Sequence, residues 1–211
     1  MSYSEKYIKY KTKYENLKNN IDGDNNSIDG NIVLSKFNNQ GPKDAYKALF
    51  LEYGKPEIIL NRPYGIAIWT APTIGPFISL MLMDESTEHL EPVSHCDFLY
   101  AMVHVYISDD ILPKVLALSK SIYYDRLKQE LNIRCHSMKP IIAVLNLALK
   151  IINNPANYQF YLSAYGETIM STVNQNVYKN LYTEVEQMVK VNQEQYKNIS
   201  PNLKCTNSAW I

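Results

Sequence analysis

Four short apolar runs, separated by turn-forming residues, constrain this chain most strongly. They read "EIILN" at 57–61, "GIAIWTA" at 65–71, "FISLMLM" at 77–83 and "DFLYAMVHVYI" at 97–107, with Pro and Gly between the first three. Runs of this length, rich in β-branched and aromatic residues, are typical of strands. Because strands joined by short turns must pair antiparallel, the pattern predicts a four-stranded antiparallel meander.

The last of these runs is apolar on both faces. Its alternation places Leu99, Ala101 and Val103 on one side and Tyr100 and Met102 on the other. An antiparallel sheet usually exposes one face to water, so a second apolar face requires a helix, a partner or a ligand to cover it.

Helical spacing appears in four other segments. One runs through 45–53 and stops at Gly54, a residue suited to a helix C-terminus. Further helices are expected over 108–124, over the apolar 138–154, and from Gly166 to about residue 192. The fold class is therefore expected to be α+β, with these helices packed on the sheet.

The amino-terminal segment carries a regular stripe of large side chains. Tyrosines and a leucine recur at steps of three and four residues, the spacing of a coiled-coil seam: Tyr3, Tyr7, Tyr10, Tyr14 and Leu17. Such a short helix is marginal in isolation, so we expect it to order against a protein partner or a second copy of the chain. These five residues are the predicted partner-binding set.

The domain organisation follows from changes in composition. Residues 1–20 form the amphipathic Tyr/Lys arm, and the Asn-, Asp- and Gly-rich residues 21–42 read as a flexible linker. Residues 43–198 are expected to make one α+β domain that ends in a long amphipathic helix, and 199–211 a tail.

Charge and cysteine content exclude several classes of protein. Lys plus Arg equals Asp plus Glu at 21 each, which argues against a general polyanion binder. Three widely spaced cysteines do not suggest a secreted disulfide scaffold. The longest apolar run, 141–152, is too short to span a bilayer. Intracellular location in a reducing compartment is expected.

Two Cys/His-containing segments invite a zinc hypothesis. "SHCD" at 94–97 and "RCH" at 134–136 supply two cysteines and two histidines: His95, Cys96, Cys135 and His136. Adjacent residues on a strand point to opposite faces, however, so neither pair is expected to converge on one ion. Buried structural thiols and hydrogen-bonded histidines are the favoured interpretation, with no metal and no cofactor.

A thiol-dependent enzyme is the alternative reading of the same segments. Cys96 would be the nucleophile, His136 its base and Asp97 the orienting carboxylate. No glycine-rich oxyanion turn accompanies either cysteine, and phosphate-binding glycine motifs are absent. The acidic string "DESTEHLE" at 84–91 offers ligands for a divalent ion, although a solvated loop explains it better.

Nucleic-acid binding is the second alternative. Residues 1–20 hold five lysines and two glutamates, a local net charge of +3, and their tyrosines could stack on bases. Protein contact explains the stripe better, because a tyrosine on a helical seam buries its ring and keeps its hydroxyl at the wet rim.

The opening "YSEKYIKYKTKYENLKNN" resembles the starts of proteins from mimivirus-like giant DNA viruses, and the blocks "YGKPEIILNRPYGIAIW" and "HCDFLYAMVH" resemble uncharacterised proteins of such viruses. The resemblance implies a place in the host cytoplasm or the virion. It leads to the expectation of a non-enzymatic structural or assembly protein that binds a protein partner through its arm and its C-terminal helix.

Overall fold

One antiparallel sheet of six strands organises the protein. The computed structural model describes residues 34–60 and 64–199. The strand order is β1-β2-β3-β4-β6-β5, and every neighbouring pair is antiparallel. The strands are β1 (Ile58–Leu60), β2 (Ile66–Thr70), β3 (Ser79–His89), β4 (His95–His104), β5 (Ile122–Asp125) and β6 (Glu130–Cys135). The α+β class is confirmed, but the expected four strands are too few.

The two missed strands form the β5–β6 hairpin. The sequence pattern predicted one helix over 108–124, whereas the observed helix α4 spans only Leu112–Leu116. Gln129 just before β6 adopts a positive φ of 55°. Because hairpin turns that need positive φ are usually recognised by Gly or Asn, a glutamine at that position hid the turn.

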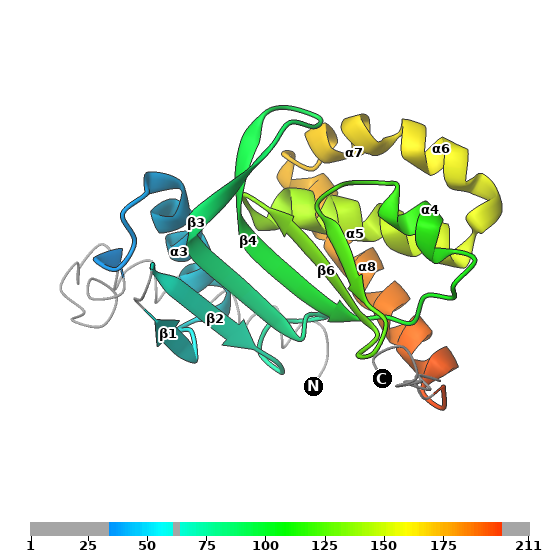
Figure 1. Ribbon diagram of the computed structural model, residues 1–211, viewed down its shortest axis with the longest axis horizontal. Coiled ribbons are helices and arrows are strands. Elements are labelled where there is room, and N and C mark those ends of the chain that lie inside the picture. Colours follow the sequence, from blue (N-terminus) through cyan, green and yellow to red (C-terminus); the bar gives the residue numbers. More distant parts are fainter. Residues whose placement is uncertain (1–33, 61–63, 200–211) are drawn as a thin grey trace, which may run out of the picture.

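Strand β3 is longer than expected, and it bends. Residues 84–89 continue the strand rather than forming a solvated loop, so that prediction was wrong. The pairing of β3 with β4 shifts register between Leu82 and Thr87, which is a bulge. Bulges increase local twist, and beyond this one the end of the β3–β4 hairpin curls over the sheet toward the helices (Figure 1).

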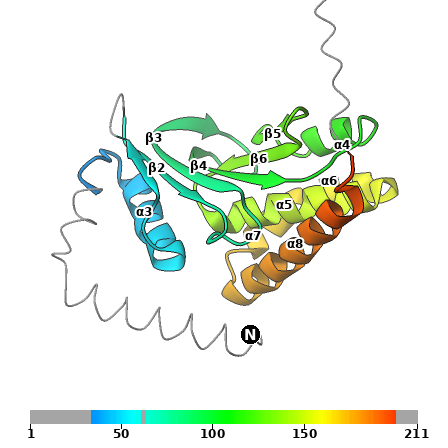
Figure 2. The ribbon, with the colours of Figure 1, turned by 90° about the horizontal axis from the view of Figure 1, so that it is seen from below.

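The helices cover one face of the sheet. They are α3 (Gln40–Tyr53), α4, α5 (Met138–Asn153), the 3₁₀ turn η1 (Pro155–Asn157), α6 (Tyr158–Ser163), α7 (Tyr165–Ser171) and α8 (Gln175–Tyr196). Figure 2 shows α3, α5 and α8 on the same side of the sheet. Gly54 ends α3 with φ 86°, as predicted. Within the described segments, no helix is both long and apolar enough to cross a membrane.

The predicted long helix after Gly166 is two helices. Helix α7 ends at Ser171 and α8 begins at Gln175. Asn174 caps α8 by accepting a hydrogen bond from the Asn176 amide at 2.9 Å. Asparagine is among the best N-cap residues because its side-chain oxygen satisfies an otherwise unpaired amide. The apolar period ran across this break because α7 and α8 both pack on α5.

Helix α5 is the centre of the core. Thirteen of its sixteen residues are buried, as the apolar sequence predicted. Full burial of a side chain such as Leu145 contributes ~2 kcal/mol. The polar Asn146 is also buried and donates to Glu184 of α8 at 2.9 Å, while Lys150 pairs with the same carboxylate group at 3.2 Å. These polar contacts hold α8 against α5.

The two faces of β4 have different fates. Leu99, Ala101 and Val103 are buried on the side of the helices, whereas Tyr100 and Met102 are only half-buried on the opposite side. No described helix lies over that second face (Figure 2), so of the three covers expected from the sequence, a helix, a partner or a ligand, the described helices do not supply it.

The expected linker end at 42 is also corrected. Phe37 is 1% exposed and packs in the core, so the fold includes residues before 43. The buried carboxylate of Asp84 accepts from the backbone amides of Asn38 and Asn39 at 2.8 and 2.9 Å. Their side-chain amides add two bonds to the same aspartate. Asp84 is thus the anchor of the segment that leads into α3, not a metal ligand in a wet loop.

Candidate metal centre

Three histidines, a cysteine and an aspartate meet at the curled end of the β3–β4 hairpin. His89 ends β3 and pairs across the hairpin with His95, which begins β4. Cys135 ends β6 opposite Leu99 of β4, and His136 follows in the bend before α5. The His95 ring lies between the other two, 5.0 Å from His89 and 4.9 Å from His136 by centroids.

The reactive atoms of this cluster converge on the Nε2 atom of His95. That nitrogen lies 3.0 Å from Asp97 Oδ1 and 3.3 Å from Cys135 Sγ. The same sulfur lies 3.6 Å from His136 Nδ1. Two overlapping triads have ligand atoms within 4.8 Å of one another: His95 with Cys135 and His136, and His89 with His95 and Asp97.

Hydrogen-bond accounting fixes the tautomer of His95. Its Nδ1 lies 2.7 Å from the carbonyl oxygen of Val93, and since a carbonyl only accepts, Nδ1 must carry the proton. In the neutral form of the ring Nε2 then carries a lone pair, and in the imidazolium form it carries the second proton of the ring. Nε2 faces the carboxylate oxygen Oδ1 of Asp97, which accepts no hydrogen bond within the described part of the chain. Two lone pairs this close repel each other unless a proton or a metal ion lies between them.

Asp97 is fully buried, and its second oxygen is compensated. Ser121 donates its hydroxyl to Oδ2 at 2.9 Å. Arg134 Nε lies 3.4 Å from Oδ2, as an ion pair without hydrogen-bond geometry. A buried carboxylate needs such partners, because desolvation of an unpaired charge is costly.

The protonation states of the neighbours suit a metal site. Burial, and then the charge of Asp97, raises the pKa of the Cys135 thiol to about 12. Burial lowers the pKa of His89, and desolvation followed by the nearby His95 lowers that of His136. Neutral imidazoles are the form that binds metals. A thiol with so high a pKa is a poor nucleophile when free, but a bound metal ion displaces its proton.

A cavity of about 320 Å³ opens beside the cluster, between the hairpin end, the start of α5 and α7. His89, His95, Cys135 and His136 line one part of it. The rest of the lining is mostly apolar and includes Pro92, Val93, Pro140, Val144, Ile169, Met170 and Val173. The triad of His95, Cys135 and His136 therefore borders a space large enough for a small ligand.

The structure assembles part of each set considered from the sequence. Of the four residues in the zinc hypothesis, it brings His95, Cys135 and His136 together, while Cys96 is exposed and outside the cavity lining. The objection that adjacent residues diverge does not hold for Cys135 and His136, because the strand ends between them. His89, assigned to a loop, was missed as a member of the cluster.

The predicted thiol-enzyme set is not assembled. His136 contacts the sulfur of Cys135 rather than that of Cys96. Asp97 is buried beside His95, while Cys96 is exposed on β4. The partner-binding residues of the arm, Tyr3 to Leu17, lie outside the described residues, so that prediction stays a prediction.

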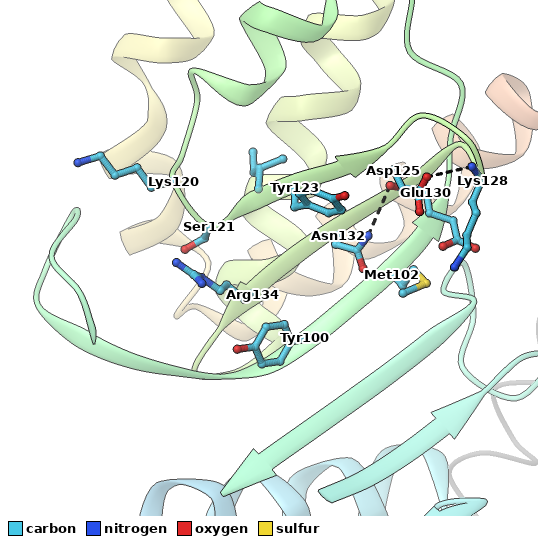
Figure 3. Close-up of a pocket in the computed structure, with 11 residues that line it drawn as sticks. Tyr100, Met102, Lys120, Ser121, Tyr123, Asp125, Lys128, Glu130, Asn132 and Arg134 are labelled. Carbon is cyan, nitrogen blue, oxygen red and sulfur yellow. Dashed lines mark hydrogen bonds between the residues drawn. The ribbon is translucent and has the colours of Figure 1, made fainter. Parts of the chain in front are cut away.

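A second hollow, of about 360 Å³, lies on the open face of the sheet (Figure 3). Tyr100, Tyr123 and Asn132 form its floor, and Lys120 and Lys128 lie at its rim. Ser121 and Arg134 line both this hollow and the cavity beside the His/Cys cluster. Arg134 therefore reaches Asp97 from the open side of the sheet.

Comparisons with protein-family models, with curated proteins and with solved structures gave no match to this chain.

Proposed function

We propose that this protein binds a single Zn²⁺ ion through His95 Nε2, Cys135 Sγ and His136 Nδ1. The observation that carries the proposal is the position of His95 Nε2, which lies 3.0 Å from Asp97 Oδ1 and 3.3 Å from Cys135 Sγ while Nδ1 donates to the Val93 carbonyl oxygen. A metal ion bound to Nε2 and Sγ displaces the thiol proton and removes the repulsion between the lone pairs of Nε2 and Asp97 Oδ1.

The spacing of the ligand atoms supports zinc. Bonds of ~2.05 Å to nitrogen and ~2.3 Å to sulfur in a tetrahedron place nitrogen and sulfur ~3.5 Å apart. The observed separations are 3.3 Å for His95 and 3.6 Å for His136. A thiolate also favours zinc over the hard ions that carboxylates prefer.

Only one ion fits at a time. Both triads use His95, and its Nδ1 is already hydrogen-bonded to Val93. The remaining nitrogen, Nε2, can coordinate one ion, so the two triads cannot be occupied together. Asp97 then lies beside the ion and adds negative charge, while the Val93 carbonyl oxygen, which accepts from Nδ1, orients the His95 ring as backbone carbonyls commonly do for metal-bound histidines. Three protein ligands leave one coordination position for an outside molecule, the arrangement of reactive rather than purely structural zinc sites.

The experiment is a cobalt titration of the metal-free full chain, because Co²⁺ bound to a thiolate gives a charge-transfer absorption. We expect one ion per chain, displaced by Zn²⁺, with the sulfur band lost in Cys135→Ser. Cys96→Ser is the matched control, since that cysteine is exposed and outside the cavity. The proposal fails if the wild-type chain binds no ion, or if both serine variants lose the band equally.

The assembly role suggested by the sequence is compatible with a metal site and is kept as a second proposal. The tyrosine stripe of residues 3–17 supports it. Deleting residues 2–20 should abolish capture of a protein partner while leaving the melting temperature of the domain nearly unchanged. Undiminished capture in a pull-down would contradict this role.

A further inference from the structure

We infer that the metal site, as proposed above, accepts a monoanionic head group carrying an unbranched apolar tail, that is, an alkyl carboxylate or its hydroxamate. The inference rests on the proposed function for the head and on the cavity walls for the tail. The two parts can be tested separately.

The head is assigned by charge. A divalent ion held by one thiolate and two neutral imidazoles has a net charge of about +1, and the adjacent Asp97 carboxylate is balanced by its ion pair with Arg134. The open position therefore favours a single negative charge. Lys139 also lines the cavity and donates to the carbonyl oxygen of Val173 at 3.0 Å. Glu91 on the same lining opposes a more highly charged ligand such as a phosphate.

The tail is assigned by the walls. Pro140 and Val144 of α5 line the cavity together with the metal ligands, and Ile169 of α7 adds a third apolar side chain to the lining. Because such walls offer no hydrogen-bond partners, burial of polar groups against them is unfavourable. Methylene groups make no hydrogen bonds with water, so none are lost when they are buried there, and the removal of their apolar surface from water is favourable.

The mouth of the cavity is apolar as well as its interior. Val93, Met170 and Val173 all line it, and their exposed fractions are 59%, 57% and 66%. Three large exposed apolar side chains from two separate segments meet at this opening. Clustered exposure of this kind marks a binding surface rather than ordinary scatter of hydrophobic residues.

The test uses the Co²⁺-loaded full chain and a series of straight-chain hydroxamates from two to eight carbons. The cobalt spectrum reports binding of the head, and the tail length is the variable. We expect affinity to rise about fourfold for each added methylene, the equivalent of ~0.8 kcal/mol per buried CH₂. The rise should stop when the tail outgrows the cavity.

A matched pair of variants locates the tail. Val173→Asn at the mouth should flatten the chain-length series while leaving the cobalt spectrum unchanged. Val191→Asn makes the same substitution at a similarly exposed site on α8, outside the cavity lining, and should leave the series intact. Both positions are exposed, so neither variant should impair folding.

The outcomes separate the two proposals. If Co²⁺ binds but every hydroxamate has the same affinity, or none binds, the inference is overturned while the metal site stands. If Co²⁺ itself does not bind, the metal site and the ligand assignment fall together. Equal flattening in both asparagine variants would also overturn the placement of the tail.

Discussion

Replacing Asp97 by asparagine and by alanine tests the lone-pair conflict directly. In Asp97→Asn, the amide oxygen can take the place of Oδ2 and accept from Ser121. The amide nitrogen then takes the place of Oδ1, 3.0 Å from His95 Nε2, and donates where the wild-type carboxylate oxygen can only accept. A repulsive contact becomes a hydrogen bond.

The two variants should differ clearly in stability. The new hydrogen bond contributes ~1 kcal/mol, which offsets the lost ion pair to Arg134, whose side chain is 31% exposed and whose pairing contributes ~1 kcal/mol. Asp97→Asn should therefore unfold within ~1 kcal/mol of the wild type. Asp97→Ala removes the ion-pair partner of Arg134 and the carboxylate that accepts from Ser121, whose hydroxyl keeps only its contact with His89 Nδ1, and should cost ~3 kcal/mol.

Urea unfolding in the presence of a chelator measures both free energies on metal-free protein. A cobalt titration of the same samples completes the test. Asp97→Asn should bind the ion tenfold to a hundredfold more weakly, because its amide occupies the His95 lone pair and its charge is gone. If asparagine destabilises the protein as much as alanine does, or if it binds the ion as well as the wild type, the assigned tautomer of His95 is wrong.

Three further predictions concern the metal, the thiols and the acid limb of stability. Zinc at a hundred times its dissociation constant should stabilise the fold by ~2.7 kcal/mol and raise the melting temperature by ~5–10 °C in calorimetry, whereas Cys135→Ser should show no such shift. In metal-free native protein at pH 8, iodoacetamide should modify Cys96 and spare Cys135, whose pKa of about 12 leaves ~1 thiolate in 10⁴; mass spectrometry showing rapid loss of the Cys135 thiol would contradict its burial. Burial raises the pKa of Asp84, but four hydrogen bonds from Asn38 and Asn39 outweigh it and lower the pKa below 3.8. The stabilisation by Asp84 is thus complete above its pKa in the unfolded state and is lost as the pH falls through its pKa in the folded state. In Asp84→Asn, the free energy of unfolding measured with urea should therefore depend less on pH in the acid range. An unchanged pH dependence would refute this.

Much of the fold was predictable because its signals are local. The apolar α5, the glycine that ends α3 and the first four strands all follow from spacing and turn residues. The β5–β6 hairpin was missed because Gln129 makes a turn that glycine usually makes. The break between α7 and α8 was missed because both helices bury their apolar faces against the same partner.

The site was predictable in its residues but not in its geometry. His95, Cys135 and His136 were singled out by type, yet local reasoning about a strand gave Cys96 equal standing. What selects among them is the curl of the β3–β4 hairpin after its bulge, which brings His89 and His95 over the end of β6. That convergence depends on contacts across some forty residues, and no local pattern contains it.

The placement of the ligands on the scaffold has a consequence for metal exchange. Cys135 ends an interior strand, and His136 lies two residues before α5, the most deeply buried of the described helices. Amides in such elements exchange with deuterium only through opening of the whole domain, so they report the global free energy. Binding or loss of the ion should therefore change the protection factors of all amides in β6 and α5 by the same factor. The order of protection among these amides should stay the same, because the backbone is a rigid frame in both states.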